Sequence, residues 1–257
     1  MKKVRIIDLS VPTEESPSEA LPLQVVHEDH QSSVPAMQAF FGCRPEDLPQ
    51  GLAWANDSVK MISHSGTHVD APWHFFPTTG GHRARTIDAM PLEWFWGPGV
   101  VLDMRHKPQG SEVTVADLEL ALARIRYRIQ PGDIVLIQTG ADKYWGKAEY
   151  VNAGCGMGRE STLWLIDQGA RVMGIDAWGW DRPFSAMKEE FQRTGKKELL
   201  WAGHRAGIER EYCHIEKLAN LDQLPRPTGF TLACFPVKLT GGSAGWCRAV
   251  AIVEEDK

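Results

Sequence analysis

The sequence predicts a single α/β domain built around a mixed β-sheet. Three continuous apolar runs, bounded mainly by glycine, proline and charged residues, have the length of buried strands. Segments with helical spacing of apolar residues separate these runs, and such alternation of strands and helices is typical of an α/β fold. No repeat, low-complexity tract or clear linker interrupts the 257 residues, so we expect one domain over residues 1–257. The three runs are Gly99–Met104, Asp133–Thr139 and Arg171–Asp176.

The N-terminal part of the chain combines one strand with a long irregular region. Val4–Leu9 is a short apolar run that leads towards Pro12, and it predicts a strand. Residues 13–54 are rich in Pro, Ser, Glu and Gln. A loop of this length in a compact domain is usually functional or partly helical, and we expect the same here.

Two helices are expected between the buried strands, and two more strands near the end of the chain. In Thr114–Ile129 the apolar residues recur at helical spacing, and Asp117 follows Thr114 by three residues, as at a capped helix N-terminus. Glu160–Gln168 predicts the second helix. The expected C-terminal strands are Phe230–Lys238 and Ala249–Val253.

Composition argues against several classes of function. The 28 basic and 33 acidic residues give a formal net charge of −5, whereas nucleic-acid binding normally needs a basic patch. No window approaches the roughly 18 apolar residues of a membrane span. The start of the chain lacks the apolar stretch of about 7–15 residues that a signal peptide needs. The five cysteines are scattered and contain no CxxC pair, which favours reduced thiols. We therefore expect a cytoplasmic protein with a small-molecule substrate and no nucleic-acid or membrane partner.

Histidines cluster in one short segment, residues 64–76, which reads HSGTHVDAPWHFF. Its polar candidates all occupy even positions, and alternate side chains of an extended chain share one face. Gly66 can bend the backbone, while Pro72 argues against one continuous helix. Imidazoles and carboxylates are common ligands of Zn²⁺, Mn²⁺ and Fe²⁺, and three protein ligands leave a position for water. The cluster therefore favours a catalytic metal site over histidines with a structural role. The candidates are His64, His68, Asp70 and His74.

The pattern His-x-Gly-Thr-His-x-Asp-x-Pro-x-His resembles the signature of the cyclase family of metal-dependent hydrolases, which includes bacterial kynurenine formamidases and isatin hydrolases. The resemblance covers most of the chain from about Ile6 onward, including Gly132–Leu136, Gly174–Asp176 and Phe235–Leu239. It implies a swivelling β/β/α-type fold. It also implies a homodimer or homotetramer in which the N-terminal loop region meets a neighbouring subunit.

The same resemblance implies a set of metal ligands. His64, His68 and Asp70 would hold a first metal. In the formamidases a second metal is bridged by this aspartate, and here His204 and Glu216 match the residues that complete its site. The isatin hydrolases use one manganese, so the cofactor is expected to be one or two divalent ions per chain, Zn or Mn.

A metal at this site would lower the pKa of a bound water from 15.7 towards about 7, and the hydroxide would attack a carbonyl. The resemblance makes His74 the general base and acid rather than a ligand. We therefore expect a hydrolase of an amide, lactam or lactone bond in a small aromatic or cyclic substrate. A serine hydrolase is not expected, because the sequence has no GxSxG elbow. Two alternatives stay open: a ring-closing cyclase or dehydratase on the same site, and a non-catalytic protein that binds a small molecule at a metal.

The sequence departs from the formamidase pattern at Ala177–Phe184, and an insertion follows at Ser185–Leu200. This departure leaves the metal motif intact but bears on the substrate. Four aromatic residues are candidates for a substrate pocket, with burial in the core as the alternative for each. They are Trp73, Phe75, Trp178 and Trp180.

Overall fold

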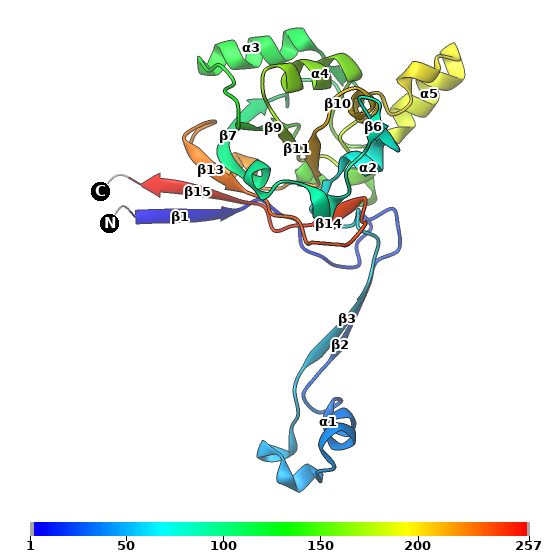
Figure 1. The fold of residues 1–257 in the computed structure, drawn as a ribbon, viewed down its shortest axis with the longest axis vertical. Coiled ribbons are helices and arrows are strands. Elements are labelled where there is room, and N and C mark those ends of the chain that lie inside the picture. The colour runs from blue at the N-terminus through cyan, green and yellow to red at the C-terminus, as the bar shows by residue number, and fades with distance from the viewer. Residues whose placement is uncertain (1–2, 256–257) are drawn as a thin grey trace.

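A nine-stranded mixed sheet forms the centre of the fold (Figure 1). In sheet order its strands are β1 (Lys3–Asp8), β15 (Val250–Glu255), β13 (Phe230–Ala233), β7 (Trp96–Asp103), β9 (Ile134–Gln138), β11 (Val172–Ile175), β12 (Cys213–Glu216), β4 (His68–Asp70) and β14 (Ala244–Trp246). The four strands from β7 to β12 run parallel, and the other neighbours pair antiparallel. This confirms the predicted α/β class. The computed structural model describes residues 3–255, so residues 1–2 and 256–257 of the predicted domain lie outside the described residues.

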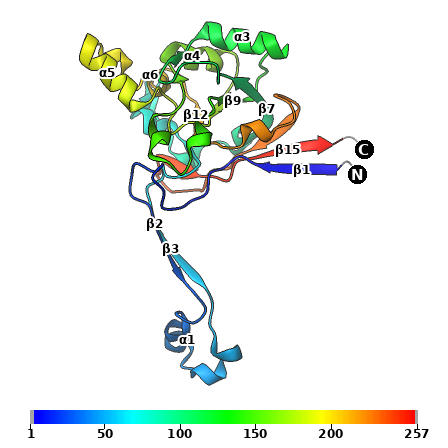
Figure 2. The same cartoon turned by 180° about the vertical axis from the view of Figure 1, so that it is seen from behind.

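Helices connect the parallel strands and cover one face of the sheet (Figures 1 and 2). Leu118 and Leu165, from the first two of the crossover helices, belong to the core on that face. Along β7, Val100 and Leu102 point into this core, while Val101 points into a second core on the other face. The side-chain alternation of a strand thus supplies both cores. The helices are α3 (Val115–Ile125), α4 (Arg159–Asp167), α5 (Phe184–Thr194) and α6 (Ala202–Arg205).

Two predicted elements are shorter than expected, each for a local reason. Helix α3 begins after Thr114 with the expected cap, but it ends at Ile125 because Arg126 adopts a left-handed conformation with φ of 53°. Strand β13 ends at Ala233, shortly before Pro236, which cannot donate a ladder hydrogen bond. The other predicted helix and strands are confirmed within a few residues of their expected ends.

Most of the irregular region, residues 13–54, belongs to an arm that extends away from the sheet (Figures 1 and 2). The arm is an antiparallel pair, β2 (Gln24–Glu28) and β3 (Asn56–Lys60), with helix α1 (Val34–Phe41) at its far end. The expectation of partial helix is confirmed. The side chains of Phe40 and Phe41 are 77% and 70% exposed, which is unusual for adjacent aromatics.

Short elements complete the fold around the sheet. They are helix α2 (Pro72–Phe75) and the two-stranded pairs β5 (Thr78–Thr79) with β6 (His82–Arg83) and β8 (Glu112–Val113) with β10 (Gly156–Met157). Across residues 3–255, no helix combines the length and apolar character needed to cross a membrane.

Candidate metal centre

Two neighbouring strands of the sheet bring four polar side chains to one buried place. Strand β4 carries His68 and Asp70, and strand β12 carries His214 and Glu216. The register pairs His214 with Asp70 and Glu216 with His68. Alternate residues of a strand share a face, so these four side chains point the same way. Val69 lies between the first two and packs in the core on the opposite face.

The outer histidines of the motif reach the same carboxylate by turning the chain at both ends of β4. Gly66, with φ of 61°, folds the segment back so that His64 Nδ1 lies 2.8 Å from Asp70 Oδ1. Pro72 starts helix α2, whose turn places His74 Nε2 3.8 Å from Asp70 Oδ2. Only residues 68–70 are strand, so the alternation of an extended chain applies to His68 and Asp70, and Gly66 bends the backbone as expected. The four predicted side chains nevertheless converge.

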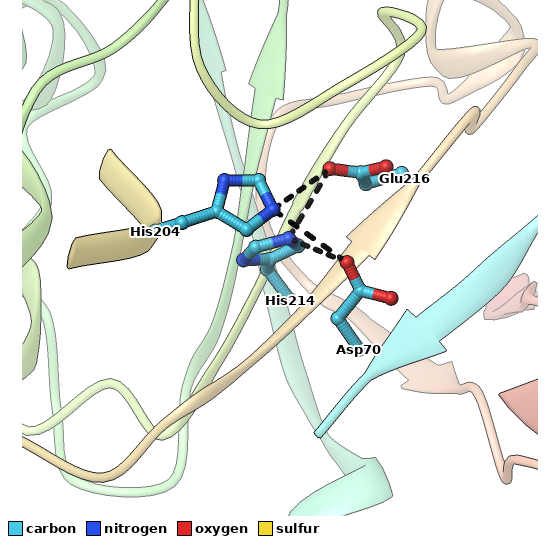
Figure 3. A group of neighbouring side chains, drawn as sticks. All are labelled: Asp70, His204, His214 and Glu216. Atoms are coloured by element: carbon cyan, nitrogen blue, oxygen red, sulfur yellow. Dashed lines mark hydrogen bonds and ion pairs between the residues drawn. The ribbon is translucent and has the colours of Figure 1, made fainter. Parts of the chain in front are cut away.

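His204 and Glu216, paired by resemblance alone, also meet here (Figure 3). His204 comes from α6, and its Nε2 lies 3.8 Å from Asp70 Oδ2 and 3.7 Å from Glu216 Oε1. Its Nδ1 contacts Asp181, which also accepts hydrogen bonds from two backbone N–H groups, those of Gly203 at 2.6 Å and of His204 at 3.2 Å. Asp181 therefore fixes both the ring and the start of α6.

His214 belongs to the cluster although sequence reasoning did not select it. Its Nε2 lies 3.1 Å from Asp70 Oδ2 and 3.2 Å from Glu216 Oε1 (Figure 3). The signal was present, because His214-x-Glu216 repeats the His68-x-Asp70 spacing on a strand. It was hidden because the pairing of β12 with β4 joins segments about 145 positions apart.

The arrangement of lone pairs at the centre fits a bound cation. His68 Nδ1 bonds the carbonyl oxygen of Gly66 at 2.9 Å, and this carbonyl can only accept, so Nε2 carries the lone pair. That Nε2 faces Asp70 Oδ1 at 3.2 Å and Glu216 Oε2 at 3.5 Å. Within residues 3–255, His68 Nε2 and Asp70 Oδ1 are buried and form no well-aligned hydrogen bond, and the close polar contact of Asp70 Oδ1 is the ion pair with His64 Nδ1 at 2.8 Å. Buried polar atoms without partners are costly, and a divalent ion would satisfy both.

Both carboxyl groups are held in the ionised form that a metal requires. Burial opposes ionisation of Asp70, but the surrounding histidines, including hydrogen bonds from His204 and His214, outweigh it and hold the pKa of Asp70 well below its usual range. For Glu216, burial and the neighbouring Asp70 also oppose ionisation, yet the hydrogen bond from His214 helps lower its pKa to about 2. Two adjacent buried carboxylates therefore concentrate negative charge at one point.

The two histidines on either side of this charge differ in protonation. Burial lowers the pKa of His74 to about 3, so its ring is neutral at pH 7. Burial has the same tendency at His204, but Asp181 and Asp70 overcome it and raise its pKa to about 10. A metal that uses His204 as a ligand must displace this proton, so its uptake is coupled to pH.

A cavity of about 380 Å³ opens beside these residues. This volume is at the small end of the range for ligand pockets, which is about 300–1,000 Å³. Apart from the histidines and a few charged groups, the cavity wall is largely apolar. Its lining includes His64, His74, His204, Glu216, Leu21, Ile62, Trp178, Phe184, Trp201 and Lys217.

The structure corrects the expected aromatic pocket for three of its four residues. Trp178 lines the cavity. Trp73 is partly exposed outside it, where Arg83 lies 5.8 Å from its ring centroid. Phe75 and Trp180 are core residues, as the alternative held, and each stacks on the His214 ring. They support the metal centre from behind and do not form a substrate wall.

Phe184 lines the cavity although sequence reasoning did not select it, and so does Trp201. The Trp201 ring stacks on that of His204, with centroids 4.3 Å apart and planes 11° apart. Its φ is 59°, a left-handed conformation that is strained for a bulky residue. Nothing in the residue pattern marks this conformation, because it depends on the path from α5 to α6.

Comparison with known proteins places these observations among relatives. The family model described as "Putative cyclase" matches residues 7–182. A kynurenine formamidase of Erythrobacter litoralis is 27% identical over 75% of this chain and 74% of its own length. An isatin hydrolase of Roseibium aggregatum is 28% identical over 79% of this chain and 75% of its own. The solved structure of isatin hydrolase A from Labrenzia aggregata, bound to benzyl benzoate, superposes with a TM-score of 0.75 at 25% identity, covering 98% of this chain and 94% of that one.

Proposed function

Because this chain belongs to the cyclase family, we propose that it is a metal-dependent hydrolase that cleaves an amide C–N bond, linear or cyclic, in a small aromatic substrate. A small lactone is a second substrate of the same chemistry. The observation that carries the proposal is the buried convergence of His64 Nδ1 and His68 Nε2 on Asp70 Oδ1, at 2.8 Å and 3.2 Å, where His68 Nε2 has no hydrogen-bond partner. Its relatives include proteins named kynurenine formamidase and isatin hydrolase, which supports the same reaction class.

Three residues of the motif would hold a first divalent ion, Zn²⁺ or Mn²⁺: His64, His68 and Asp70. Such an ion supplies a Lewis acid that polarises a carbonyl and lowers the pKa of water. The chain orients the imidazoles through their second nitrogens, as metal-binding histidines usually require. His68 Nδ1 bonds to the carbonyl of Gly66, and His64 Nε2 lies 3.0 Å from Ser243 Oγ.

A second ion would share Asp70 and add His204 and Glu216. Asp181 orients His204, and the backbone N–H of Trp180 donates to Glu216 Oε1 at 2.8 Å. The four ligand atoms of Asp70, His204, His214 and Glu216 all lie within 4.8 Å of one another. The donor set therefore accommodates one or two ions per chain.

His74 is the residue we propose for proton transfer. Its ring is neutral because burial lowers its pKa, and it lines the cavity beside Asp70. A neutral Nε2 can accept the proton of the attacking water and return it to the leaving nitrogen, which balances the hydrolysis. Positioned acid–base catalysis of this kind contributes typically about 10²–10⁴-fold.

The cavity wall supports a flat apolar substrate. Trp178, Phe184 and Trp201 line the cavity together with His64, His74 and His204, and Trp201 stacks on the His204 ring. Aromatic pairs prefer stacked or edge-to-face contact, so an aryl group fits between these walls with its carbonyl towards Asp70. The small volume favours one or two fused rings over a peptide.

Metal content and turnover together test the proposal. The protein is purified without chelator or histidine tag, its metals are measured by elemental mass spectrometry, and it is assayed with an aryl formamide, isatin and a small lactone. We expect one or two equivalents of Zn or Mn and hydrolysis of at least one substrate. Less than about a tenth of an equivalent after added metal would contradict the metal centre. Saturable binding without turnover would favour the binding protein, and release of water without hydrolysis would favour the cyclase or dehydratase.

A further inference from the structure

A buried lysine lies directly after the last residue of the metal cluster. Lys217 follows Glu216 at the end of β12, and its side chain is 2% exposed. Its φ of 57° is left-handed, which turns its side chain away from the strand direction. A cation this deep needs a compensating partner, because an isolated buried charge is very costly.

That partner is Glu19, from the segment that leads to the arm. Lys217 Nζ donates to Glu19 Oε2 at 2.7 Å and to the carbonyl oxygen of His64 at 2.9 Å. The other oxygen, Glu19 Oε1, accepts the backbone N–H of Gly66 at 2.6 Å. The Glu19 side chain is 3% exposed, so the whole arrangement is removed from solvent. The ion pair therefore holds the backbone on both sides of Ser65, through the carbonyl of His64 and the N–H of Gly66.

These hydrogen bonds hold the turn that places His64 next to Asp70. The turn depends on the positive φ of Gly66, and its two flanking backbone groups are the ones held by Glu19 and Lys217. The charge of Glu19 also neutralises the ammonium, which would otherwise repel a cation bound at Asp70. Lys217 lies 5.1 Å from the ring centroid of Trp178, so the same pair touches the cavity wall.

We propose that Glu19 and Lys217 are a positioning pair that sets His64 for metal binding and ties the base of the arm to the site. Glu19 lies shortly before β2, and His64 lies shortly after β3. The ion pair therefore links the segment before β2 to the segment after β3, where both adjoin the cavity. This inference rests on the proposed function, since it assigns His64 to the metal.

The pair can be separated from simple structural support by a comparison of single and double variants. Glu19→Gln removes one charge, and a lysine left unpaired in the interior destabilises the fold. Glu19→Leu together with Lys217→Met removes both charges, and replacement of a buried pair by apolar residues is often neutral or stabilising. The double variant keeps the fold but lacks the groups that hold His64 and Gly66. Glu209→Gln, which breaks an exposed ion pair with Arg159, is the matched control.

The measurements are the affinity of the metal-free proteins for Mn²⁺ by titration calorimetry and the midpoint of thermal unfolding. We expect Glu19→Gln to lower the affinity of the ion held by His64 about 10–100-fold, the usual effect of losing an outer contact to a ligand. The double variant should recover the unfolding midpoint but not the affinity, while Glu209→Gln changes neither. Wild-type affinity in the double variant would overturn the positioning role. A wild-type protein that takes up neither Mn²⁺ nor Zn²⁺ would overturn the proposed function itself, and this inference with it.

Discussion

Asp70 is the residue on which the site depends, because every other member is placed by its relation to that carboxylate. His64, His68, His74, His204 and His214 all approach its two oxygens, at 2.8–3.8 Å. Five imidazoles around one buried carboxylate cannot all be ligands of the same ion. Substitutions of single residues can separate the histidines that bind metal from the one that transfers protons.

For His74 we expect a loss of turnover without a loss of metal. In His74→Ala the ligands remain, but no side chain accepts a proton beside the cavity, so kcat should fall about 10²–10⁴-fold. Elemental analysis and steady-state kinetics on the same preparation check this. His82→Ala, on the exposed hairpin β5–β6, serves as the control. Metal loss from the folded variant would place His74 among the ligands.

For Asp181, in contrast, we expect a loss of metal affinity. In Asp181→Asn the His204 ring loses the charged acceptor at Nδ1, which both orients the ring and strengthens its other nitrogen as a ligand. Metal affinity should fall about 10–100-fold, as is typical for such partners. Competition with a chelator measures the change, and Asp167→Asn on the surface of α4 is the comparison. Unchanged affinity would mean that His204 holds no ion.

The residue pattern predicted the members of the site that share a short segment, the family resemblance alone added His204 and Glu216, and His214 was missed. The alternation of His64, His68, Asp70 and His74 is visible along the chain. His214 became a neighbour only through strand pairing. Glu19 and Lys217 could not be paired from the sequence either, since a buried ion pair between distant positions leaves no local pattern.

At the scale of elements, helix α3 begins with the N-terminal cap that the local sequence predicted. Thr114 and Asp117 form the reciprocal cap that the sequence predicted, with Asp117 Oδ2 accepting the Thr114 N–H at 2.8 Å. The boundaries that local signals misplaced, the ends of α3 and β13, depend on one left-handed residue and one proline. The arm could be predicted only as partly helical, because its strands pair with each other across about 30 residues and show no apolar face.

The cap of α3 gives a prediction of pH-dependent stability. Burial opposes ionisation of Asp117, but hydrogen bonds from Lys107 and Thr114 lower its pKa from the usual 3.8 to about 2. A folded-state pKa below the unfolded value stabilises the protein above about pH 4, and this contribution is lost as the pH falls towards 2. Asp117→Asn should therefore cost about 0.5–2 kcal/mol at pH 7.

Chemical unfolding of both proteins between pH 2 and pH 7 measures this difference. The gap between wild type and variant should close below pH 4. Glu119→Gln, exposed on the same helix, should show no such trend. A gap that is constant down to pH 2 would show that the carboxylate charge is not what stabilises the cap.

At the scale of the whole molecule, the arm is the feature that a lone chain does not explain. The arm extends away from the sheet (Figure 1). Aromatics as exposed as Phe40 and Phe41 usually mark an interaction surface. We propose that the protein is a homodimer or homotetramer in which the arm packs on a neighbouring subunit. Closed symmetric assemblies are the commonest oligomers of such chains.

Substitution at the tip of the arm tests this assembly. Phe40→Ser with Phe41→Ser should lower the molar mass measured by light scattering, because the interface loses its aromatic anchors. Leu120→Ser, also exposed but on α3, should leave the mass unchanged. A wild-type protein that is monomeric at micromolar concentration would contradict the proposal.

Strand β4 has a further consequence for how the chain reaches its native state. It is three residues long, lies between β12 and β14, and places His68 and Asp70 on one face with Val69 on the other. A shift of one residue would exchange the faces, leaving a valine among the carboxylates and two polar groups in the core. The proposed ion would bind only when β4 pairs in the correct register, so it would stabilise that register. Removal of metal should therefore lower stability by about 2.7 kcal/mol for an ion present at 100 times its dissociation constant. Hydrogen exchange should accelerate in β4 well before it does in β9, and equal rates in the two strands would contradict this. On the proposed function, a chain with β4 in the wrong register would not bind the ion, and metal binding would therefore select the native pairing.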